Sequence, residues 1–154
     1  MSEPITWQLV EWIAARMKLI DGGEGWHTSI DANAICTERA QLRDRASHPQ
    51  LLVSTGEINI DAEQSGQRTT ALSIELIVQY MVPMRAGLES EKLAHRALAD
   101  MRRALQGAVT REAPLKLRHI TVNSCSVLPD AEGAHSIFAQ VIAQAGVSES
   151  LPPA

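Results

Sequence analysis

The sequence predicts an α+β fold, a mostly antiparallel sheet of about four to five strands with two helices packed on one face. Residues 5–20 and 89–106 repeat apolar side chains every three or four positions, the spacing of one helix face. Residues 51–82 alternate apolar and polar side chains around a polar turn, the pattern of a β-hairpin with one buried face. Residues 118–147 contain two further short stretches in which apolar and polar side chains alternate, so the expected order is α-β-β-α-β-β.

The size and charge of the chain limit the classes of protein it can belong to. Its 154 residues, 45% of them hydrophobic, suit one domain, which we expect over residues 1–147, with 148–154 as an exposed tail. No apolar run approaches the roughly 20 residues that cross a bilayer, so a soluble protein without a membrane partner is expected. A formal charge of −4 and 3% aromatic residues disfavour non-specific DNA binding and base stacking.

The first helix is expected over residues 5–20, and a long loop follows it. The apolar stripe consists of Ile5, Leu9, Ile13, Met17 and Ile20. Pro4 suits a first helical turn, and Gly22 can end the helix in a left-handed conformation. Residues 22–49 have no sustained period, and we expect a short strand near 26–30 and one helical turn around 37–42. Such long loops are uncommon in compact domains and are often functional.

The hairpin is expected from two strands joined by the polar turn at 61–68. In the first strand, Leu52, Ile58 and Ile60 are expected to share one face. The second strand has the clearest pattern in the chain. Its core face should carry the even-numbered residues Leu72, Ile74, Leu76, Val78, Tyr80 and Val82. Pro83 ends this strand because it lacks an N–H donor.

The second helix is expected over residues 89–106, with Gly107 after its last turn. Its apolar face comprises Leu93, Ala97, Leu98, Met101, Ala104 and Leu105. The charged residues, Glu91, Lys92, Arg96, Asp100, Arg102 and Arg103, are expected to point mostly away from that face.

The C-terminal third is expected to form a second hairpin. Residues 118–128 read as a strand with a kink near Ser124 that brings Cys125 and Val127 into the apolar phase, and residues 129–133 as a turn. Residues 135–147 fit both alternation and a helical stripe. The strand is preferred, because a hairpin partner explains the preceding turn.

No motif in the sequence predicts catalysis, a metal site or a cofactor. The five histidines lack metal-ligand spacing, and the glycines at 22–25 match neither a phosphate loop nor a dinucleotide fold. Cys36 and Cys125 have no marked base nearby and are expected to be free thiols, although the sequence leaves one disulfide between them open. We therefore expect a protein that is not an enzyme.

One cationic cluster stands out in the long loop. It comprises Arg39, Arg43 and Arg45, partly neutralised by Glu38 and Asp44. A solvated loop explains the cluster somewhat better than a phosphate site does. A third interpretation is a polar subunit interface that becomes ordered on assembly.

The order of these elements resembles the tail terminator (tail completion) proteins of long, non-contractile-tailed bacteriophages. The resemblance covers residues 5–147. It rests on the helix ending in a glycine turn, the variable loop, the Pro-Gln-Leu-Leu-Val strand entry at 49–53, the strand Thr-Ala-Leu-Ser-Ile-Glu-Leu-Ile-Val at 70–78, the second helix and the last hairpin.

The resemblance implies a structural virion protein, assembled in the host cytoplasm. Six copies would form a ring on the head-proximal end of the tail tube, stop tail polymerisation and present the head-docking surface. The implied partners are further copies of the chain, the tail tube protein and a head–tail connector, with DNA passing through the ring without specific binding. By position, the loop and the hairpin turn are the expected contact regions. The candidate residues are Arg39, Arg43, Asp44, Arg45, Asp61, Glu63, Gln64, Gln67 and Arg68.

Two other functions are compatible with the sequence. One is another neck, head-completion or minor tail protein of a virion, because such proteins share small α/β folds and also form rings. The other is a small cytoplasmic ligand-binding or enzymatic domain that uses the sheet face opposite the helices. Against the second, only Glu75 is ionisable on that face of the strand at 70–82.

Overall fold

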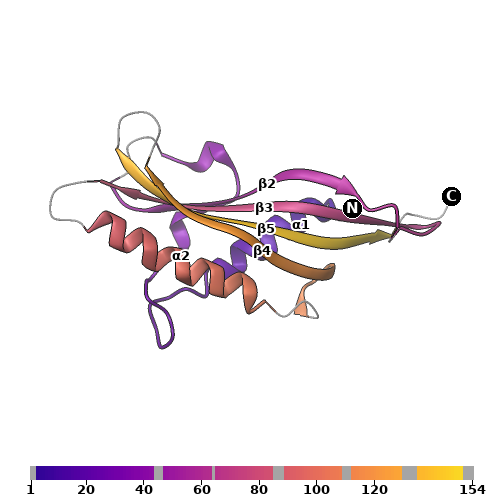
Figure 1. Cartoon of the computed structure of the whole chain (residues 1–154), viewed down its shortest axis with the longest axis horizontal. Coiled ribbons are helices and arrows are strands. Elements are labelled where there is room, and N and C mark those ends of the chain that lie inside the picture. The colour runs from indigo at the N-terminus through magenta and orange to yellow at the C-terminus, as the bar shows by residue number, and fades with distance from the viewer. Residues whose placement is uncertain are drawn as a thin grey trace.

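The protein is an α+β domain with five strands in one sheet (Figure 1). The computed structural model describes residues 3–43, 47–63, 65–84, 89–108, 112–129 and 135–150. Its elements are α1 (Ile5–Met17), β1 (Ile35–Cys36), β2 (Gln50–Ile60), β3 (Thr69–Pro83), α2 (Ser90–Gln106), β4 (Lys116–Pro129) and β5 (Ser136–Ser150). The sheet order is β1-β2-β3-β5-β4. The expected fold is confirmed, except that β1 pairs parallel with β2 and makes the sheet mixed.

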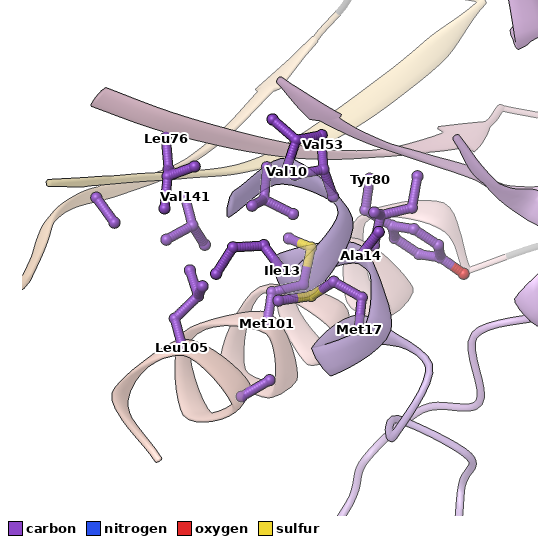
Figure 2. Packing of buried hydrophobic residues seen from close by; sticks show 14 of the residues in the cluster. Val10, Ile13, Ala14, Met17, Val53, Leu76, Tyr80, Met101, Leu105 and Val141 are labelled. Carbon is purple, nitrogen blue, oxygen red and sulfur yellow. The ribbon is translucent and has the colours of Figure 1, made fainter. Parts of the chain in front are cut away.

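Both helices pack their apolar stripes on the same face of the sheet. Figure 2 shows Ile13 and Met17 of α1 together with Met101 of α2 beneath the strands. Leu9, Ile13 and Met17 of the expected stripe are buried and Ile5 is half-buried. The helix ends at Met17 instead of residue 20, so the buried Ile20 lies beyond it, before a turn in which Gly22 has a φ of +79°. Neither described helix is long and apolar enough to cross a membrane.

The apolar face of α2 is also as expected, but Asp100 is not exposed to solvent. The residue is 1% exposed, and its carboxylate accepts hydrogen bonds from the backbone N–H groups of His27 and Thr28. The expectation that Asp100 points away is wrong, because the loop after α1 folds back over this position and supplies donors.

The same contact explains why no strand forms at residues 26–30. Asp100 takes the backbone donors of His27 and Thr28, so those donors are not available to a sheet ladder. The segment makes only an isolated bridge between Asp21 and Ser29. The short strand of the loop lies further along, at Ile35–Cys36. The described part of the loop has two 3-10 turns, at Ala32–Ala34 and at Arg39–Gln41, and the second lies where the one helical turn is expected.

The β2–β3 hairpin has the expected core face on β3 and a different one on β2. Leu51 pairs with Tyr80 and Val53 with Val78, so Leu51 and Val53 face the helices while Leu52 faces the other way. Between Thr55 and Ile58 the register shifts by one residue, a β-bulge. The bulge reverses the alternation, which is why the expected common face for Leu52, Ile58 and Ile60 is wrong.

The last hairpin is confirmed as two strands, with β5 between β3 and β4. A register shift between Val122 and Ser124 is the expected kink, and after it Cys125 pairs with Val141. Residues 148–150, expected in an exposed tail, continue β5 and pair with the start of β3. Residues 151–154 and the expected turn residues 130–133 lie outside the described residues.

Candidate assembly interface

The cationic loop presents its arginine side chains to solvent while its backbone is held by hydrogen bonds. The carbonyl of Arg43 accepts a bond from Gln50 Nε2 (3.0 Å), and its N–H donates to Gln50 Oε1 (2.8 Å). Gln41 Oε1 accepts the N–H of Thr37 at 2.9 Å. Arg39 and Arg43 are both exposed, so the described loop offers two cations on a fixed backbone. The remaining candidates of this loop, Asp44 and Arg45, lie outside the described residues.

A hollow of about 500 Å³ lies beneath this loop, between Asp31, Cys36, Arg43 and His48. Burial raises the pKa of the Cys36 thiol, so less of the reactive thiolate is present near neutral pH. Among the described residues, no three His, Cys, Asp or Glu side chains come together in a group that could hold a metal ion. The geometry of the hollow therefore gives no support to nucleophilic chemistry at Cys36.

The tip of the β2–β3 hairpin is a turn closed by its own hydrogen bonds. Ser65 Oγ donates to the carbonyl of Asp61 (2.7 Å) and accepts the N–H of Ala71 (2.9 Å). These bonds fix the tip and leave the side chains of Glu63, Gln67 and Arg68 exposed. Asp61 is half-buried, and Gln64 lies outside the described residues.

The two candidate regions do not come together in the structure. They lie at opposite ends of β2, whose 11 residues span roughly 33 Å at about 3.3 Å per residue. In Figure 1 the hairpin tip is at the right-hand end of the sheet and the 3-10 turn of the loop is at the upper left. The candidate residues therefore form two separate surfaces.

A third surface, absent from the sequence prediction, is the outer edge of β2. Among the described residues, β1 covers this edge only at Leu51 and Leu52. Beyond the bulge, Ile58 is 45% exposed and Ile60 70% exposed, although both face the helix side of the sheet. The signal in the sequence is Gly56, since a glycine inside a strand pattern often marks a bulge.

Gly56 lies where the bulge passes the side chain of Glu75. A Cβ at position 56 would overlap the Glu75 carboxylate. On the same uncovered face of the sheet, polar side chains pair across strands: Gln79 Nε2 donates to Gln140 Oε1 (2.8 Å), and Gln144 Nε2 donates to Ser73 Oγ (2.6 Å). Polar pairs joined by hydrogen bonds thus alternate on this face with apolar pairs such as Ile77 and Ile142.

The fold is shared with a chain of a virion and with a chain of a contractile injection system. A chain in the virion of a native gene transfer agent particle matches with a TM-score of 0.58 and 13% identity, over 94% of this chain and 96% of that one. A chain in the sheath/tube terminator of an extracellular contractile injection system, in its extended state, matches with a TM-score of 0.54 and 11% identity. This match covers 100% of the present chain and 62% of the other.

Comparisons by sequence, with protein-family models and with curated proteins, found no match. At these identities the likeness is one of fold. The resemblance inferred from the order of elements is therefore confirmed at the level of the fold, which this chain shares with a virion component and with a chain of a sheath/tube terminator assembly.

Proposed function

We propose that this protein is a tail terminator, which forms a ring on the head-proximal end of a phage-type tail tube. The observation that carries the proposal is the fold likeness over the whole chain to a component of a sheath/tube terminator. In this function the ring stops addition of tube subunits and presents a surface to the head–tail connector. Six copies per ring, as the resemblance implies, is part of the proposal.

The positions of the two polar surfaces support this function. A terminator contacts the tube on one side and the connector on the other, so it needs two surfaces on different sides of the subunit. The loop with Arg39 and Arg43 and the tip with Glu63, Gln67 and Arg68 lie at opposite ends of β2. Hydrogen bonds within each region hold its backbone before any partner arrives.

The charge of the chain is compatible with DNA passing through the ring. At a formal net charge of −4, the protein does not attract a polyanion as a whole. A passage that DNA must cross rapidly is better served by weak attraction than by a dense array of cations. The proposal therefore includes DNA as a passing molecule and no sequence-specific contact.

Electron microscopy of particles made without this protein tests the proposal. The expected result is abnormally long tails without heads, since nothing stops the tube from growing. Normal tails that fail to join heads would instead assign the protein to the neck or to head completion. Complete virions with normal tails would reject both functions and favour the ligand-binding alternative, which a thermal-shift ligand panel then tests.

A further inference from the structure

Among the described residues, no strand pairs with the outer edge of β2 beyond Leu52 or with the outer edge of β4, and these two edge strands run in opposite directions. β2 is antiparallel to β3, β3 to β5 and β5 to β4. β2 and β4 are therefore antiparallel to each other. A second copy placed beside the first in the same orientation sets its β4 antiparallel to the β2 of the first, as a continuous antiparallel sheet requires.

The strand registers place Ile58, on the edge strand β2, level with Ile120, on the edge strand β4. Ile58 pairs with Ile74, Ile74 with Ala145, and Ala145 with Ile120. The four side chains form one row on the helix side of the sheet. In an unstaggered continuous sheet, Ile58 of one copy lies next to Ile120 of the following copy, and the row continues across the boundary.

Ile58 and its neighbour Ile60 give this contact a driving force. Ile58 and Ile60 are among the few exposed large apolar side chains of the described residues, and Ile120 is half-buried at the other edge. Bringing the edges together removes apolar surface from water and pairs backbone groups that are otherwise left to solvent.

Charge on the two edges is complementary. The sequence of β2 contains one acid, Glu57, and no base, whereas β4 contains Lys116, Arg118 and His119 and no acid. In the same register Asn59 lies level with His119, because both align with Ser73 and Gly146. Glu57, two residues earlier, is then a diagonal neighbour of His119 across the boundary.

We propose that copies of this chain associate by pairing Gly56–Ile60 of β2 with Leu117–Thr121 of β4 in the next copy. The contact is head-to-tail, so an open series of copies keeps one free β2 edge and one free β4 edge at its two ends, and it closes into a ring when the rotation between copies permits. The pairing deepens the proposed function, on which it rests for the closed ring. β1, which covers β2 at Leu51 and Leu52, limits the pairing to the tip end of β2.

Disulfide trapping tests the pairing in purified protein. The variant carries Ile58→Cys and Ile120→Cys in a Cys125→Ser background, because Cys125 is exposed and would react. Within one copy the two positions are separated by three strand spacings, about 14 Å, which is too far for a disulfide. Mild oxidation should therefore give a ladder of cross-linked dimers, trimers and larger species on a denaturing gel.

The controls separate this pairing from other contacts. Ile58→Cys alone should give no cross-link, and a dimer from it would indicate a symmetric β2–β2 contact instead. Ile58→Cys with Arg102→Cys, on the exposed face of α2, should give no ladder, and a ladder there would indicate random collision. Absence of a ladder from the Ile58/Ile120 pair would overturn the proposal.

A second variant gives a readout that does not depend on oxidation. Ile58→Lys should reduce the particle mass measured by light scattering to that of the monomer while leaving the melting temperature of the subunit unchanged. An unchanged mass would contradict the pairing. The outcome is separable from that of the proposed function: a ladder with normal tails in the deletion lysate rejects the terminator alone, and overlong tails without a ladder reject the pairing alone.

Discussion

Thr28 and Asp100, 72 positions apart in the sequence, are joined by two hydrogen bonds to one carboxylate oxygen. The backbone N–H and the hydroxyl of Thr28 each donate to Asp100 Oδ2 at 2.7 Å. Arg103, on the same helix, donates to the carbonyl of Gly25 and stacks over the ring of Trp26 at 5.0 Å. The loop that follows α1 is thus anchored on α2 by one buried anion and one cation.

Replacing Asp100 by alanine should lower the free energy of unfolding by about 2–4 kcal/mol, because buried donors of His27 and Thr28 lose a charged acceptor. Urea denaturation followed by circular dichroism measures the change. The matched control is Asp31→Ala, an exposed carboxylate that accepts the N–H of Asn33, with an expected cost of about 1 kcal/mol or less. Equal costs for the two variants would contradict the anchoring function of Asp100.

Gly56→Ala should destabilise the domain by about 1 kcal/mol, because the new Cβ displaces the Glu75 carboxylate from the bulge. The side chain of Glu75 is flexible at its far end, which keeps the cost moderate. In a Glu75→Ala background the same change should cost less, and a double-mutant cycle measures the difference. Gly66→Ala, with nothing within 4 Å of the new Cβ, is the control. A cost for Gly56→Ala that is unaffected by Glu75→Ala would refute this explanation.

Leu76→Asp should prevent folding, because it places an unpaired charge at a fully buried position in the middle of β3. Leu76→Ala should fold with a loss of about 2–5 kcal/mol in unfolding free energy. Far-UV circular dichroism and solubility distinguish the two, with His95→Asp on the exposed face of α2 as a control for the added charge. A soluble, folded Leu76→Asp protein would show that the core face of β3 is misassigned.

Stability should fall as the pH rises above about 10. Burial raises the pKa of Tyr80 from 10.0 to about 12, so the unfolded state loses this proton first. The stabilisation is present in full below pH 10 and is lost on the way to pH 12, up to about 2.7 kcal/mol. Denaturation of the wild type and of Tyr80→Phe across this range measures the difference between them. Parallel pH profiles for the two proteins would contradict the assignment.

Arg43→Glu should leave the subunit folded and impair assembly. Its side chain is exposed, while the contacts that hold its backbone come from Gln50 and are not changed by the substitution. Light scattering measures the particle mass and thermal unfolding the stability, with Arg102→Glu on α2 as the matched charge reversal. A variant that assembles as well as the wild type would remove the cationic loop from the interface.

Much of the fold could be predicted from the sequence because the helices and β3 each have one uninterrupted buried face. Leu9, Ile13 and Met17 keep helical spacing without a break, and β3 alternates without a bulge. The buried face of β2 is harder to predict, because the extra residue at the bulge reverses the alternation of its side chains after Thr55. A prediction that assumes one uninterrupted alternation of buried and exposed side chains along the strand gives the wrong face for every residue after the bulge.

Contacts between distant segments could not be predicted. Asp100 looks like an ordinary charged residue on a helix, and its donors come from a loop more than 70 positions earlier. The sequence predicts that the loop and tip residues are polar and exposed, but their placement at opposite ends of β2 depends on the sheet order. The free edge beyond Gly56 likewise exists only because β1 is short.

The position of β5 has a consequence for biosynthesis. β5 lies between β3 and β4 and pairs with both along nearly its whole length, yet it is made after them. During translation, β3 lacks one neighbour and β4 has none until β5 has left the ribosome. The backbone N–H and C=O groups on the edges that β5 later occupies stay unpaired until then, so the nascent chain is most vulnerable to aggregation just before its sheet closes.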